Sequence, residues 1–240
     1  MKKVLLYSGG MDSWLADKII KPDERIYIDI KSRYSDAELQ KIQKAGSDVR
    51  IVSFPLTKYE QSGDHTVPFR NLFFAAIAAA EYMGDINIYL AANAGDEHVG
   101  DKSPEFAKMA SKLLTYISQN MSRTPDNREI KIILPFSNMT KAEVLAKYIE
   151  TGGDLETAYN ESFSCYEPEP NGTECWNCQP CFRKAVAFTL NGYEFTDGKK
   201  KKLINFYERK ILPDWNNWSK YHKKEAKETL IAIKLWTANK

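Results

Sequence analysis

The segment Ser8-Gly9-Gly10-Met11-Asp12-Ser13 has the composition of an anion-binding loop. It follows the apolar segment Lys3–Tyr7 and precedes helical spacing that reaches about Ile20, so it joins a strand to a helix. Glycines permit a tight turn and a close backbone approach to a ligand, and a helix start offers unpaired N–H groups to phosphate. Because Asp12 would repel phosphate, a magnesium ion is expected beside it. The alternative is a plain strand-to-helix turn capped by Asp12 or Ser13.

The chain has four cysteines, and their spacing is C-x9-C-x2-C-x2-C over Cys165, Cys175, Cys178 and Cys181. Two-residue gaps let successive thiolates converge on one ion, and four thiolates define a closed, tetrahedral, structural zinc site. An iron–sulfur cluster is the main alternative, and free buried thiols are another. Because a closed site leaves no position for a substrate, we expect the metal to stabilise the fold and not to take part in catalysis.

The strands and helices around the glycine loop and the cysteines must position them, and the sequence alternates between strand and helix patterns. Apolar segments predict five strands, at Lys3–Tyr7, Arg25–Ile30, Val49–Phe54, Ile86–Ala92 and Ile130–Leu134. Helical spacing and capping signals predict helices at about 12–20, 35–44, 70–83, 103–119 and 140–150. Repeated strand–helix units predict an α/β fold with an open, mostly parallel, doubly wound sheet. Ligands of such sheets bind at the carboxyl ends of the strands, where the glycine loop lies.

The composition is that of an ordinary globular protein, with 43% hydrophobic and 28% charged residues. The longest uncharged apolar run, Leu72–Ala80, has nine residues, whereas a membrane span needs about 20. The apolar stretch near Met1 is also shorter than the roughly 7 residues that a signal peptide requires. We therefore expect a cytoplasmic protein without a membrane partner.

The loop pattern S-G-G-x-D-S after a first strand resembles that of the PP-loop ATP pyrophosphatases. Three later regions are similar, in the same order, to 7-cyano-7-deazaguanine synthases of that superfamily: Val67-Pro68-Phe69-Arg70-Asn71, then Asn138-Met139-Thr140-Lys141-Ala142-Glu143, then Ser164-Cys165-Tyr166 with Cys175-x2-Cys178-x2-Cys181-Phe182-Arg183. The resemblance covers residues 1 to about 195. It implies a PP-loop (adenine nucleotide hydrolase-like) sheet, a zinc-stapled helical C-terminal part and a homodimer.

The same resemblance implies a reaction. An ATP-dependent ligase of this family converts 7-carboxy-7-deazaguanine and ammonia to 7-cyano-7-deazaguanine, for deazapurine modification of nucleic acid as in queuosine biosynthesis. The carboxylate attacks the α-phosphate of ATP to give an acyl-adenylate and pyrophosphate, and ammonia then displaces AMP. A second adenylation, on the amide oxygen, leads to the nitrile.

The family's site residues carry over to matching positions of this sequence. The loop residues that would hold the nucleotide are Ser8, Gly9, Gly10, Met11, Asp12 and Ser13. Asp12, with Mg²⁺, and Lys141 are the expected catalytic groups, and the alternative for Lys141 is a solvated surface lysine. Arg70 and Asn71 are expected to face the nucleotide or substrate, or else to form hydrogen bonds at a helix start. The glycine–glutamine pair that the family has after its second strand is absent here. Asp29 at that strand end is expected to contact the adenosine, or else simply to end the strand.

The segment from Asn93 to Phe106 departs from the family's substrate loop. The family's Tyr-Pro pair is lost, and its Cys-Arg pair becomes Lys102-Ser103. The remaining candidates for substrate contacts are Asn93, Asp96, Asp101 and Lys102. The loop therefore leaves ATP use in place and puts the identity of the substrate in question.

The C-terminal tail, residues 199–240, is basic. It holds 12 Lys/Arg and 4 Asp/Glu, a net charge of +8, with three of the five tryptophans. We expect helices that pack on the body or form a dimer, and nucleic-acid binding through basic and aromatic residues is the alternative. His222 is expected to be structural or exposed. The predicted divisions are 1–155 for the PP-loop domain, 156–198 for the zinc segment and 199–240 for the tail.

Two rival functions remain open at this point. One is a related PP-loop enzyme that adenylates a different carboxylate or amide. The other is a zinc-ribbon nucleic-acid-binding protein with a degenerate loop. The intact Ser8–Ser13 pattern favours an enzyme.

Overall fold

A computed structural model describes residues 1–44, 48–61, 66–96, 98–121 and 127–238. Glu97, within the predicted substrate loop, lies outside the described residues. None of the described helices is both long and apolar enough to cross a membrane.

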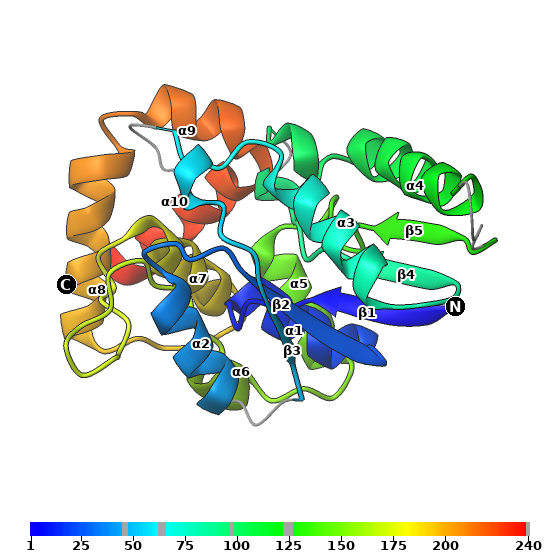
Figure 1. Cartoon of the computed structure of the whole chain (residues 1–240). Coiled ribbons are helices and arrows are strands. Elements are labelled where there is room, and N and C mark those ends of the chain that lie inside the picture. Colours follow the sequence, from blue (N-terminus) through cyan, green and yellow to red (C-terminus); the bar gives the residue numbers. More distant parts are fainter. Residues whose placement is uncertain (45–47, 62–65, 97, 122–126, 239–240) are drawn as a thin grey trace.

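A five-stranded parallel sheet forms the centre of the protein (Figure 1). Its strands are β1 (Lys2–Leu6), β2 (Glu24–Asp29), β3 (Arg50–Ser53), β4 (Ile86–Tyr89) and β5 (Ile130–Ile133), in the spatial order β3-β2-β1-β4-β5. On strand β1, Val4 is in register with Glu24 on one side and Ile88 on the other. The predicted doubly wound α/β sheet is confirmed, and the strand order reverses between β1 and β4.

Helices cover both faces of this sheet. They are α1 (Met11–Ile20), α2 (Ser35–Lys44), α3 (Arg70–Glu81), α4 (Pro104–Gln119) and α5 (Lys141–Glu150). Alanines of α3 and α4 pack with Val4 and Ile88 in one apolar cluster. Leu5 points to the opposite face and packs in a second cluster with residues of α1 and α5. Strand residues alternate between faces, so neighbouring β1 residues belong to different cores.

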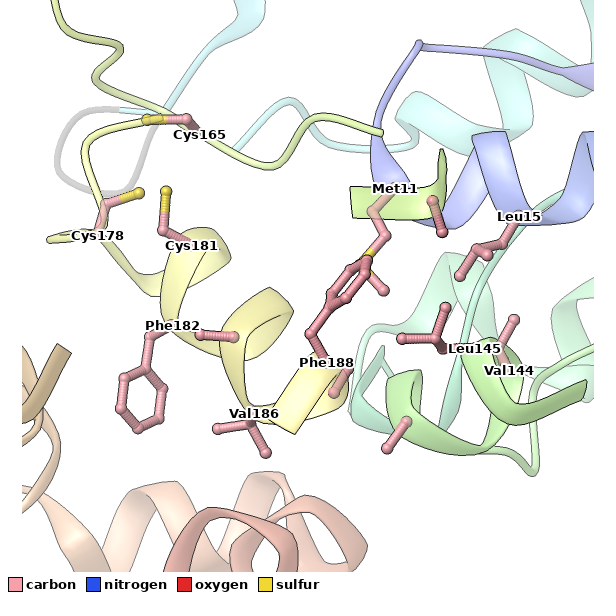
Figure 2. Close-up of a cluster of buried hydrophobic side chains, with 14 of the residues drawn as sticks. Met11, Leu15, Val144, Leu145, Cys165, Cys178, Cys181, Phe182, Val186 and Phe188 are labelled. Carbon is pink, nitrogen blue, oxygen red and sulfur yellow. The ribbon is translucent and has the colours of Figure 1, made fainter. Parts of the chain in front are cut away.

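The C-terminal part is helical and is built around α7. Its elements are α6 (Leu155–Glu161), α7 (Gln179–Leu190), α8 (Asp197–Phe206), a π-helical turn (Tyr207–Ile211), α9 (Trp215–Tyr221) and α10 (Lys223–Thr237). Helices α5 and α10 both pack on α7. Figure 2 shows Phe188 of α7 in the same apolar cluster as Met11, Leu15 and Leu145, so α7 continues the core of the sheet domain.

The basic tail packs on the body through its aromatic residues. Trp218 and Trp236 are buried, and Trp236 Nε1 donates a hydrogen bond of 2.8 Å to Thr189 Oγ1 of α7. Lysines such as Lys223 and Lys227 are exposed on the outer side. The buried indoles are unavailable for base stacking, and this disfavours nucleic-acid binding through them. The domain boundaries at about 155 and 198 stay predictions.

Candidate active site

A cavity of about 540 Å³ opens at the carboxyl ends of the strands. It lies beside the strand-order reversal between β1 and β4, where ligands of doubly wound sheets bind. Segments far apart in the sequence line it: the glycine loop, the start of α3, the start of α5, α7, the tail, and the loop residues Gly95, Asp96, His98, Val99 and Lys102. Its charged and polar wall residues include Asp12, Arg70, Asp96, Lys102, Lys141, Arg183 and His222.

The glycine loop is shaped by its own serines. Ser13 Oγ donates to the Gly10 carbonyl at 3.0 Å and accepts from the Ser8 backbone N–H at 3.2 Å. Gly9 has a φ of +71°, which favours glycine, and an added Cβ would lie 3.4 Å from Ile42 Cγ1. The loop therefore holds a fixed turn at the N-terminus of α1, where the helix dipole attracts anions.

Asp12 and Lys141 form an ion pair in the cavity wall. Lys141 Nζ donates to both carboxylate oxygens of Asp12, and Asn93 Nδ2 donates to Oδ1 at 3.2 Å. The Lys141 side chain is only 6% exposed, whereas that of Asp12 is 34% exposed. Lys141 is thus not the solvated lysine of the alternative prediction. Asp12 retains an accessible carboxylate at the cavity, which is the oxygen ligand that Mg²⁺ prefers.

A capping box places Lys141 at the first position of α5. Thr140 Oγ1 accepts from the Glu143 backbone N–H at 3.1 Å, and Glu143 Oε2 accepts from the Thr140 backbone N–H at 2.7 Å. This capping box begins the helix predicted at about 140–150, and the structure confirms that helix. The cap fixes the helix start, and with it the cation next to the glycine loop.

Three of the predicted site residues, Asn71, Asp101 and Asp29, pair with other protein groups, and of these three only Asn71 lines the cavity. Asn71 donates from its backbone and side-chain nitrogens to Asp101 at 3.0 and 2.9 Å, so this pair closes the start of α3. Neither Asp101 nor Asp29 is among the residues that line the cavity. Asp29 is buried at the end of β2, where Lys31 Nζ lies 2.6 Å from it. Arg70, which begins α3, lines the cavity beside Asn71.

The altered substrate loop brings opposite charges together. Lys102 Nζ lies 3.0 Å from Asp96 Oδ1, and the Asn93 backbone N–H donates to Asp96 Oδ2 at 3.2 Å. Burial alone would raise the pKa of Asp96, but Lys102 and Arg183 outweigh it and hold this pKa well below its usual range. Asp96 is therefore charged at neutral pH.

Arg183, His222 and Glu225 lie at or next to the cavity, and none of them was among the predicted site residues. Arg183 of α7 forms a bidentate pair with Glu225 of α10, at 3.0 and 2.8 Å. His222 lines the cavity with 8% of its side chain exposed, and burial and Arg183 lower its pKa, so the ring is neutral at pH 7. Arg183 follows the last cysteine by two positions, which was an available signal. Nothing in the sequence marked the tail residues.

Gly95 lies directly beneath the Arg183–Glu225 pair. A Cβ at this position would meet Arg183 Nη2 at 2.1 Å and the Glu225 carboxylate oxygens at 2.8 Å. We expect Gly95→Ala to lower the free energy of unfolding by about 1–3 kcal/mol, because the ion pair must move aside. Urea denaturation measures this change. Gly100→Ala is the matched control: none of the described atoms lies within 4 Å of where its Cβ would be, and a change within about 0.5 kcal/mol is expected. Equal stability of the two variants would contradict the prediction.

An aromatic wall lies on another side of the cavity. The rings of Tyr34 and Tyr166 stack at 4.9 Å with an interplanar angle of 28°, and both residues line the cavity. The Arg33 guanidinium lies 4.7 Å from the Tyr34 ring centroid. Flat apolar faces of this kind suit a planar heterocycle.

The four cysteines converge on a separate, buried site. Their sulfur atoms all lie within 4.8 Å of one another, and Figure 2 shows the side chains of Cys165, Cys178 and Cys181 around a common point. Hydrogen bonds from the Cys165 and Cys181 thiols lower the pKa of Cys178, which favours its thiolate form. The donor set fits a metal ion such as zinc in a closed site.

A buried lysine fastens the cysteine loop to α7. Lys184 is fully buried, and its Nζ contacts Glu174 Oε2 at 2.9 Å and the Ser162 carbonyl at 2.7 Å. Glu174 Oε1 in turn accepts from the Ser164 backbone N–H at 2.6 Å. Arg183, which lines the cavity, directly precedes Lys184 in α7. The cysteine loop and the cavity wall are therefore both attached to the start of α7.

The fold and the site define an α/β protein with a glycine loop at a sheet switch point and an attached cluster of four cysteines that could hold a metal ion. The chain belongs to the family described as "Queuosine biosynthesis protein QueC", whose model matches residues 48–192. The 7-cyano-7-deazaguanine synthase of Rickettsia massiliae is 29% identical over 230 residues, covering 80% of this chain and 96% of the relative. That of Pelobacter propionicus is 27% identical over 219 residues, with 80% and 94% covered.

A shorter match has higher identity. The 7-cyano-7-deazaguanine synthase of Leptospira interrogans is 33% identical over 129 residues, covering 52% of this chain and 50% of the relative. These similarities confirm the family that the motifs predicted, one of queuosine biosynthesis proteins with relatives named as synthases. The family model ends at residue 192, before α8 and the rest of the tail.

Proposed function

We propose that this chain is an ATP-dependent ligase that converts 7-carboxy-7-deazaguanine and ammonia to 7-cyano-7-deazaguanine through adenylated intermediates. The observation that carries the proposal is the Asp12–Lys141 pair at the glycine loop, inside a cavity at the sheet switch point. The matching family and the relatives named as synthases supply the substrate class.

The glycine loop would hold the β- and γ-phosphates of ATP. Ser8 and Ser13 offer hydroxyls, Gly9 lets the backbone turn, and Lys141 offers a cation at the same wall. Asp12 would bind Mg²⁺, which when bound neutralises charge on the phosphate oxygens. Catalysis then rests on positioning and on stabilising the charge of the departing pyrophosphate.

The other walls would hold the acid. Tyr34 and Tyr166 offer flat faces to the deazapurine ring, while Lys102 and Asp96 offer polar groups to its edge. Lys102 is a point charge without the bidentate grip of arginine. The acid's carboxylate oxygen attacks the α-phosphorus of ATP as the bond to pyrophosphate breaks.

The remaining steps follow from the chemistry of acyl-adenylates. Ammonia attacks the activated carbonyl and expels AMP, which leaves the amide. A second ATP adenylates the amide oxygen, and loss of AMP with two protons leaves the nitrile. The balance is two ATP consumed, with two AMP and two pyrophosphate formed, for each nitrile.

A pyrophosphate-release assay tests the proposal. With ATP, Mg²⁺, ammonium and 7-carboxy-7-deazaguanine, we expect release that depends on the acid, with two pyrophosphates per nitrile detected by mass spectrometry. Omitting ammonium should leave at most the first adenylation. Absence of acid-dependent release in protein that binds ATP would overturn the substrate assignment.

One observation favours a second candidate. The segment Lys102-Ser103 replaces the family's Cys-Arg pair in the substrate loop, so the enzyme would adenylate a different carboxylate or amide. Pyrophosphate release with another heteroaromatic acid, and none with 7-carboxy-7-deazaguanine, would favour this candidate. We further propose zinc at the cysteine site, a homodimeric assembly and a cytoplasmic location.

A further inference from the structure

The tail helix α10 is tied to the cavity by a buried ion pair. Glu225 Oε2 accepts from Arg183 Nε at 3.0 Å, and Glu225 Oε1 accepts from Arg183 Nη2 at 2.8 Å. The two side chains are 15% and 6% exposed for Arg183 and Glu225. Bidentate pairs of this kind fix the plane of the guanidinium as well as its place.

The pair continues to the carboxylate at the glycine loop. Arg183 Nη2 also donates to Asn93 Oδ1 at 3.0 Å, and Asn93 Nδ2 donates to Asp12 Oδ1 at 3.2 Å. Asn93 is buried, and its amide is oriented by these two bonds together with a 2.9 Å bond from the Gly95 N–H. Glu225 is therefore three contacts away from Asp12 along one continuous chain of hydrogen bonds.

A second contact from the same helix reaches the partner of Asp12. Thr140 Oγ1 donates to Glu228 Oε1 at 2.5 Å, one turn along α10 from Glu225. Thr140 caps the helix whose first residue is Lys141. Both members of the Asp12–Lys141 pair are thus braced from α10, which lies beyond the part of the chain that the family model matches.

We propose that Glu225 is a positioning residue for adenylation, which acts on Asp12 through Arg183 and Asn93; this rests on the proposed function. The bidentate pair with Glu225 fixes the guanidinium where its Nη2 donates to Asn93 Oδ1. Without Glu225, the guanidinium would leave Asn93 Oδ1, and the Asn93 amide would no longer be held in the orientation that donates to Asp12. The tail would then position active-site residues in addition to stabilising the fold.

Glu225→Gln tests the proposal in the pyrophosphate-release assay. We expect kcat to fall by about 10- to 100-fold, because a displacement of about 1 Å in a catalytic group costs up to that factor, with KM for ATP changed less than about 3-fold. Trp236→Phe is the control in the same helix, because it loses the bond to Thr189 far from the site. We expect it to melt at a lower temperature with an unchanged kcat.

Combination with Asn93→Ala separates positioning from general stability. If Glu225 acts through Asn93, then Glu225→Gln should add no further loss of kcat in the Asn93→Ala background. Independent, multiplying losses would overturn the proposal, as would a wild-type kcat in the single variant. Wild-type protein that releases no pyrophosphate at all would instead overturn the proposed function, and the positioning role with it.

A paired replacement covers the case in which Glu225→Gln does not fold. Replacing Arg183 by Met and Glu225 by Leu together removes both charges, which is often neutral or stabilising for a buried pair. We expect this folded variant to have a kcat at least 10-fold below that of wild type. Wild-type activity in it would show that the pair serves stability alone.

Discussion

Asp12→Ala is expected to lower pyrophosphate release from ATP by about 100- to 1,000-fold, the loss typical of removing one preorganised electrostatic group. Asp12 accepts hydrogen bonds from both Lys141 and Asn93 at the glycine loop, so its removal takes away the proposed Mg²⁺ ligand and frees both partners. Initial rates at saturating ATP, Mg²⁺ and acid measure the effect. Turnover near that of wild type would show that the magnesium role is wrong.

The same substitution should also affect stability. Lys141 is only 6% exposed and would lose its ion-pair partner, so we expect the free energy of unfolding to fall. Breaking a buried pair costs about 3–5 kcal/mol, and the partial exposure of Asp12 reduces the expected loss to about 1–3 kcal/mol. Asp12→Asn is the control, since it keeps the size of the side chain. It should recover part of the stability but little activity.

The fold was predictable because its signals are local. Each strand is a short apolar run bounded by turn residues, and α5 begins with a complete capping box. The glycine loop was recognisable for the same reason, since its residues are consecutive and their order reflects the turn they make. The predicted strand ends differ by a few residues from those observed, as at β4, which ends at Tyr89.

The rest of the site depends on contacts between distant segments. Glu225 and Arg183 are 42 residues apart, and no periodicity or spacing links them. Asn71 and Asp101 were both expected near the ligand because both lie in motif segments; in the structure they pair with each other, and only Asn71 of the two lines the cavity. A sequence shows which residues are capable of chemistry, while burial and partners decide which of them face the cavity.

Substitution of a cysteine at the four-cysteine site is expected to have a large effect on stability. Cys181→Ser should abolish zinc binding and lower the melting temperature by on the order of 10 °C or more, since about 1 kcal/mol corresponds to 2–4 °C in a protein of this size and structural zinc contributes several kcal/mol to folding. Cys181 is fully buried in the first turn of α7. Elemental analysis and thermal melting measure the two effects together.

The position of α7 gives this substitution a consequence beyond the metal site. Arg183 lies two residues after Cys181, and Phe182 between them is fully buried, so a helix start released from the metal would also release the arginine that contacts Asn93. We therefore expect the activity of Cys181→Ser to fall at temperatures below its melting transition. Ala185→Ser, in the next turn of α7, is the control that should keep its metal. Zinc retained at one ion per chain in Cys181→Ser, or iron with sulfide in the wild-type protein, would contradict the four-thiolate zinc site.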